Sequence, residues 1–193
     1  MRKAARSGIW SPCGRLRPGG AQISAAIVAF VCGLLLSLPA SAQMSPRAKQ
    51  IAAPLLDQHP VTLFQAAQAA LEAGTMEDSV ALFYLGQLRW RRYMRARPDL
   101  PPDRDPALYA AMHDVLGRPI NEWAFGDIDA LVILLRDVKA WDAATPDPLT
   151  PVAHFAAIHA DLRSGFAAFI DEIEADADSI RAERLRNGLE NRR

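Results

Sequence analysis

Two helical patterns follow one another in residues 61–96, VTLFQAAQAALEAGTMEDSVALFYLGQLRWRRYMRA, and Gly74 separates them. In the first pattern, apolar and small residues recur at helical spacing up to Gly74. A glycine in this place is typical of a helix whose C-terminal cap is left-handed. In the second, Thr75 with Asp78 three residues later favours a helix start, and Pro98 prevents the helix from continuing. Because the turn is so short, the two helices must lie antiparallel and in contact. The sequence therefore predicts a helical hairpin.

Small side chains occur where the two helices of this hairpin would meet. Over about residues 60–93 the pattern resembles a single repeat of the tetratricopeptide-type or Sel1-like families. The residues at the repeat's small, glycine and aromatic positions are Ala66, Ala67, Gly74, Ser79, Phe83 and Gly86. Ala70 departs from the repeat's aromatic position, Leu63 stands in place of its tryptophan, and no second copy begins about 34 residues later. The resemblance implies protein recognition rather than chemistry.

The chain beyond the hairpin contains further helical patterns separated by proline-rich linkers. A linker is expected over 97–105, followed by a helix from Pro106 to Leu116 that Gly117 ends, and then by a loop of about ten residues. Asp127 is expected to cap the next helix, IDALVILLRDVKAW, whose apolar face we expect to be buried. After a second linker, Thr150 is expected to cap the last helix.

The last predicted helix, about residues 151–187, has apolar residues at steps near 3.5, typical of a helix that packs along another over several turns. This stripe is an alternative candidate for a self-association surface. No segment alternates apolar and polar residues as a strand would. We therefore expect residues 61–193 to form one all-α domain of about five helices, with helices over 106–187 following the hairpin.

Residues 1–42 have the features of a signal peptide. A basic start is followed by an apolar run over residues 23–38 and by the small-residue triplet Ala40-Ser41-Ala42. The apolar run has 16 residues, short of the roughly 18 to 20 that cross a bilayer. We expect a periplasmic or secreted protein that meets the membrane only through this segment. The alternative is a protein anchored to the inner membrane by residues 23–38.

The part after residue 42 is acidic and lacks cysteine. Of the 193 residues, 50% are hydrophobic and 23% charged, which is ordinary for a folded domain. All 22 acidic residues but only 17 of the 22 basic residues lie after residue 42, a net charge of −5. Both cysteines precede Gln43, so disulfides and thiolate chemistry are excluded there. Three prolines interrupt residues 43–60, which we expect to be a flexible leader that docks or frays.

Two groups of residues are candidates for binding. Arg89 and Arg92 belong to an arginine-rich strip that would share one side of a helix and contact an acidic partner surface or an anionic wall polymer, or else remain a solvated helix end. The acidic charge argues against nucleic acid as the partner. The second group, Glu122, Trp123 and Asp127, lies in the predicted loop and would suit a basic protein.

Carboxylates in the predicted loop also allow an enzymatic alternative. Glu122 with Asp127 or Asp129 would be the acid and nucleophile of a cell-wall glycan hydrolase, with Trp123 stacking on a sugar. The structural alternative is that Asp127 caps a helix while the aromatic residue holds the loop on the core. No cofactor or catalytic motif is present to decide between them.

The histidines do not form a metal motif. His154 and His159 are five residues apart, so they lie on different sides of a helix, and we expect them to be exposed or partly packed. The sequence predicts no metal and no cofactor. It favours a non-catalytic exported helical protein that binds a partner protein in the cell envelope, as an adaptor or as an immunity-type inhibitor.

Overall fold

The computed structural model describes residues 43–193, which contain seven α-helices and one 3-10 helix and no strand. The helices are α1 (Pro46–Ala52), η1 (Ala53–Leu55), α2 (Val61–Glu72), α3 (Met76–Arg95), α4 (Asp105–Ala124), α5 (Ile128–Ala144), α6 (Val152–Ala175) and α7 (Ala177–Arg186). The predicted all-α class is confirmed. The predicted signal segment, residues 1–42, lies outside the described residues.

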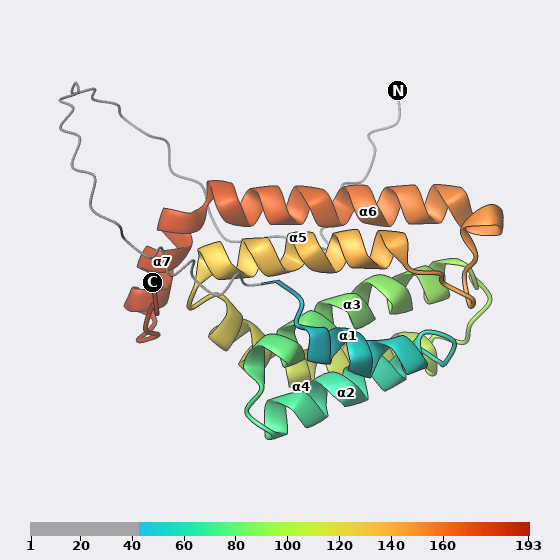
Figure 1. Cartoon of the computed structure of the whole chain (residues 1–193), viewed down its shortest axis with the longest axis horizontal. Coiled ribbons are helices and arrows are strands. Elements are labelled where there is room, and N and C mark those ends of the chain that lie inside the picture. The colour runs from blue at the N-terminus through green and yellow to red at the C-terminus, as the bar shows by residue number, and fades with distance from the viewer. Residues whose placement is uncertain (1–42) are drawn as a thin grey trace, which may run out of the picture.

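Helix α3 is the centre of the fold. Every residue from Asp78 to Trp90 is buried, because α1, α2, α4, α5 and α6 all contact this helix. α3 lies between the α5–α6 pair and the group formed by α1, α2 and α4 (Figure 1). The helix starting at Ile128 buries its apolar face as expected, including Leu131, Leu135 and Val138. α5 also keeps a solvent face that includes Ile133 and Arg136, whereas residues 78–90 of α3 are covered on all sides.

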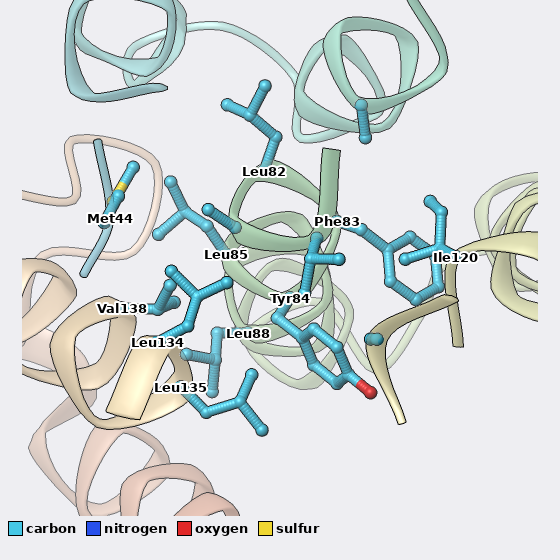
Figure 2. Close-up of a cluster of buried hydrophobic side chains, with 14 of the residues drawn as sticks. Met44, Leu82, Phe83, Tyr84, Leu85, Leu88, Ile120, Leu134, Leu135 and Val138 are labelled. Atoms are coloured by element: carbon cyan, nitrogen blue, oxygen red, sulfur yellow. The ribbon is translucent and has the colours of Figure 1, made fainter. Parts of the chain in front are cut away.

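The core is built where α3 meets its neighbours. Side chains of α3 and α5 pack together in a buried cluster that Met44 also joins (Figure 2). The buried side chains labelled there from α3 and α5 are Leu82, Phe83, Tyr84, Leu85, Leu88, Leu134, Leu135 and Val138. Burial of apolar surface at about 25 cal/mol per Å² is the main force that holds these helices together.

The predicted hairpin is formed by α2 and α3. Gly74 in the turn has a φ of +74°, the left-handed conformation that glycine adopts without strain. A Cβ added to Gly86 would lie 2.8 Å from Cδ2 of Phe64, so the close approach of the two helices requires glycine there. Thr75 does not cap α3 with its side chain, because its hydroxyl donates to the carbonyl of Ala70 at 3.2 Å.

Residues 43–60 are docked on the domain. Ser45 caps α1 by accepting a hydrogen bond from the backbone N–H of Ala48 at 2.9 Å. Met44, Ala48 and Ala52 are buried against the core. The backbone N–H of Met44 also donates to Asp137 of α5 at 3.0 Å. Of the two outcomes expected for this leader, the structure therefore has the docked one, and its prolines only shorten the helix.

The predicted end at Gly117 is wrong, because α4 continues to Ala124 and contains both Gly117 and Pro119. Gly117 serves packing instead: a Cβ there would lie 3.4 Å from Cζ of Phe83. Ile120 and Ala124 in the added turns are buried. The free energy gained by this burial offsets the loss of the backbone hydrogen bond that Pro119 cannot donate.

The last predicted helix is divided into α6 and α7 at Asp176. Within its stripe of apolar residues, Leu162, Phe166 and Ile173 are buried, whereas Val152 is exposed. The buried part of the stripe is therefore not available as a self-association surface. Thr150 does not cap α6, because its hydroxyl donates to Asp147 at 2.5 Å.

Candidate binding site

A pocket of about 910 Å³ lies where the N-terminal ends of α1, α3 and α5 come together beside the end of α4. Its apolar wall is formed by Val80, Ala124, Leu131, Leu134 and the ring of Trp123. Its charged wall is formed by Arg47, Glu77, Asp78, Asp127, Arg192 and Arg193. A concave apolar surface with a few charged groups around it is the usual form of a binding site.

Two of the pocket's carboxylates also hold the helices in place. Asp78 accepts a hydrogen bond from the hydroxyl of Ser45 at 2.5 Å, which joins α1 to α3, and lies 3.6 Å from Nε of Arg47. Asp127 caps α5 by accepting the N–H of Ala130 at 3.1 Å, as predicted. The carboxylate of Glu77 is exposed and has no ion pair among residues 43–193. Glu77 is therefore the pocket carboxylate most accessible to a ligand.

The residues after α7 fold back to one edge of the pocket. Residues 187–193, which we call the tail, follow α7 and bring Arg192 and Arg193 beside Trp123 and Asp127. The guanidinium carbon of Arg192 lies 3.9 Å from the centre of the Trp123 ring. Nε of Arg193 lies 3.7 Å from Oδ2 of Asp127. The tail thus supplies the basic groups on this side of the pocket.

The structure separates the three acidic and aromatic residues that we predicted to bind together. Trp123 and Asp127 both line the pocket, whereas Glu122 does not. Oε1 of Glu122 accepts a hydrogen bond from Nε of Arg118 at 2.9 Å on the outer side of α4. This hydrogen bond raises the pKa of Arg118. Glu122 therefore lies outside the pocket, where it pairs with Arg118 one helical turn earlier in α4.

Arg89 and Arg92 do not form an exposed basic strip, and they are not a solvated helix end either. Their exposed fractions are 3% and 2%, so neither residue is available to a partner surface. They lie on the side of α3 that faces the end of α5 and the segment between α5 and α6. Arg95, farther along the helix, forms an exposed ion pair with Asp161.

The two buried arginines are held by two buried aspartates. Arg92 forms a bidentate pair with Asp142 at 2.8 and 2.5 Å, and its Nε lies 3.2 Å from Asp147. Nε of Arg89 lies 3.2 Å from Asp142, and Arg89 also donates to the carbonyl of Pro146 at 3.2 Å. Burial lowers the pKa of Arg89, while the two carboxylates oppose that shift. This arginine–aspartate cluster joins α3 to α5 and to the following segment.

His159 completes the arginine–aspartate cluster. Its Nδ1 lies 3.2 Å from Nη1 of Arg92, and its Nε2 lies 2.6 Å from the carbonyl oxygen of Thr150. Because the arginine can only donate and the carbonyl can only accept, the neutral tautomer with hydrogen on Nε2 satisfies both contacts. The expectation that this histidine would be exposed or partly packed is wrong, since its exposed fraction is 2%.

The carboxylates proposed for glycan hydrolysis each have a structural partner. Asp127 caps α5, Asp129 lies 3.1 Å from Arg181, and Glu122 pairs with Arg118.

Within residues 43–193, no cluster of three or more histidine, cysteine or acidic side chains has the arrangement of a metal site. No helix in that same range has the length and apolarity needed to span a membrane.

Sequence reasoning did not identify most of the charged residues of the pocket. Asp78 was expected only to cap a helix, and Arg47, Glu77, Arg192 and Arg193 carried no periodicity or motif. These residues come together only because α1 and the tail dock at the same end of the fold.

Comparisons with models of protein families, with curated proteins and with solved structures gave no match to this chain.

Proposed function

We propose that this chain is an exported, non-catalytic helical protein that binds a partner protein in the cell envelope, as an adaptor or as an immunity-type inhibitor. The observation that carries the proposal is the pocket at the converging ends of α1, α3 and α5. Its volume of about 910 Å³ is comparable to the roughly 300–1,000 Å³ of small-molecule and cofactor pockets, so it has room for side chains of a partner. Export rests on the sequence pattern of residues 1–42.

The chemistry of the pocket suits a protein segment. Trp123 offers an aromatic surface beside apolar side chains, and the charged residues around it include both signs. Tryptophan and arginine are over-represented among the residues that contribute most to protein–protein affinity. Charges placed around an apolar centre favour one partner and one orientation over others. The alternative of a glycan hydrolase has no specific support, since each of its carboxylates is engaged in an ion pair or a helix cap.

The test is capture of the partner from the protein's own cell envelope. The tagged protein is purified together with two charge-reversal variants, and co-purifying proteins are identified by mass spectrometry against an untagged control. Glu77→Arg changes the accessible carboxylate of the pocket, whereas Asp171→Arg changes an exposed carboxylate of α6 and is the matched control.

We expect one protein to be enriched in stoichiometric amount with the wild type and with Asp171→Arg, and to be lost with Glu77→Arg. Thermal unfolding of each variant checks that the fold is intact. Failure to enrich any protein, or equal loss with both variants, would contradict the proposal.

A further inference from the structure

The tail is fixed to the domain by a buried arginine. Arg184 of α7 donates to the carbonyl of Glu122 at 2.9 Å and to the carbonyl of Glu190 at 2.8 Å. Its exposed fraction is 8%. Gly188, with a φ of +72°, turns the chain back toward α4. The last two residues are therefore directed to the edge of the pocket by contacts that precede them.

Arg192 occupies the aromatic corner of the pocket. Its guanidinium carbon lies 3.9 Å from the centre of the Trp123 ring, and its Nη1 donates to the carbonyl of Trp123. Its backbone N–H donates to the carbonyl of Gly126 at 2.6 Å. A cation over the ring of tryptophan is the strongest form of the cation–π contact. The corner therefore offers an arginine side chain the ring and the carbonyl of Trp123, while the carbonyl of Gly126 holds the backbone of the tail.

Arg193 is held more loosely on the adjacent carboxylate. Its Nε lies 3.7 Å from Oδ2 of Asp127, and 71% of its side chain is exposed. Exposed ion pairs of this kind contribute little to the free energy that holds the tail in place, because water and salt screen them. The two tail arginines thus cover recognition groups of the pocket without being buried there, and a competing ligand is able to displace them.

We infer that the pocket is a receptor for a basic, arginine-bearing segment of the partner, and that Arg192 and Arg193 occupy it until that segment displaces them. This inference rests on the proposed function and adds the chemical class of the partner. The net charge of −5 over residues 43–193 favours a basic partner. Glu77, which has no ion pair among the described residues, provides a further carboxylate that the tail leaves uncovered.

The same groups discriminate against other ligands. An anionic segment would meet the carbonyl of Trp123 and the carboxylate of Asp127, both of which are acceptors. Lysine would gain the charge attraction but lacks the planar guanidinium group that stacks on an aromatic ring. The pocket is therefore expected to prefer arginine over lysine and to reject glutamate.

The experiment measures binding of short labelled peptides by fluorescence anisotropy at low salt. The probe has the sequence Gly-Asn-Arg-Arg-Gly, and matched peptides carry Lys-Lys or Glu-Glu in place of Arg-Arg. The protein is compared with a variant that carries Arg192→Ser and Arg193→Ser, and with a second variant that carries Glu77→Gln in addition. Thermal unfolding checks that each variant is folded.

We expect the variant without the tail arginines to bind the Arg-Arg peptide about tenfold more tightly, the gain that loss of one exposed cation–π contact and one surface ion pair gives. The Lys-Lys peptide should bind more weakly and the Glu-Glu peptide not at all, and adding Glu77→Gln should weaken binding of the Arg-Arg peptide. Equal binding of the Arg-Arg and Glu-Glu peptides, or affinity that is unchanged by the tail substitutions, would overturn the inference. A partner captured through Glu77 but indifferent to the tail would leave the proposed function standing and overturn only this inference.

Discussion

Removal of the Asp142 carboxylate is the perturbation for which the structure gives the clearest magnitude. The side chain of Asp142 is fully buried, and it contacts Arg92 at 2.5 and 2.8 Å and Arg89 at 3.2 Å. In Asp142→Ala the two arginines would remain buried with Asp147 as the remaining carboxylate in contact with Arg92. Leaving an uncompensated buried charge costs about 3–5 kcal/mol. We therefore expect the free energy of unfolding to fall by about that amount.

The matched control is an exposed ion pair between α5 and α6. Arg136 and Glu174 lie 2.7 Å apart, but about half of each side chain is exposed. Glu174→Ala is therefore expected to cost no more than about 1 kcal/mol. Urea unfolding followed by far-ultraviolet circular dichroism gives both values under the same conditions.

The two outcomes differ enough to be decisive. For a chain of this size the cost expected of Asp142→Ala corresponds to a fall in Tm of roughly 6–20 °C. A double-mutant cycle with Arg92→Ala should give a coupling energy above about 1 kcal/mol. A cost for Asp142→Ala no greater than that for Glu174→Ala would refute the view that this cluster holds α3 to α5.

Four further substitutions test the remaining structural statements. Gly86→Ala should destabilise the fold by about 1–3 kcal/mol, because its Cβ would lie 2.8 Å from Phe64, and urea unfolding that shows stabilisation would contradict that packing. Asp127→Ala should cost about 1 kcal/mol through loss of the α5 cap, again measured by urea unfolding. Burial lowers the pKa of His113 in the folded chain. Near the ordinary pKa of histidine the unfolded chain therefore binds more protons than the folded chain, and the free energy of unfolding should fall as the pH drops from about 7 to about 5.5. His113→Phe should reduce that slope, and an NMR titration that places the pKa of His113 at or above its ordinary value would contradict the reasoning. Glu122→Gln should leave the fold intact, and a wall-lysis assay should detect no lysis with either form, whereas lysis that this substitution abolishes would support the hydrolase alternative.

Local signals predicted the parts of the fold that neighbouring residues determine. Gly74 adopts the left-handed conformation that its place after a helical pattern indicated. Gly86 lies at a close helix contact, as its membership in the small-residue pattern implied. Asp127 caps the helix that follows it. In each case the physical cause lies within a few residues of the pattern, or within one hairpin.

The errors arose where distant residues decide the outcome. Gly117 and Pro119 carry strong helix-ending signals, but burial of the following turn outweighs them. Arg89 and Arg92 resemble a surface strip until Asp142, about 50 residues later, is brought beside them. The pocket requires α1, α3, α5 and the tail at one end of the fold. None of these contacts has a signature in the local sequence.

Photo-crosslinking from the pocket is the most direct test of partner binding. A photoreactive benzoylphenylalanine replaces Ala130, an uncharged and partly exposed residue that lines the pocket, or replaces Asp171 on α6 as the control, and the protein is irradiated in its own cell envelope. Partner binding through the pocket predicts one discrete adduct from position 130 and none from position 171. No adduct from position 130, or the same adduct in equal yield from both positions, would contradict it.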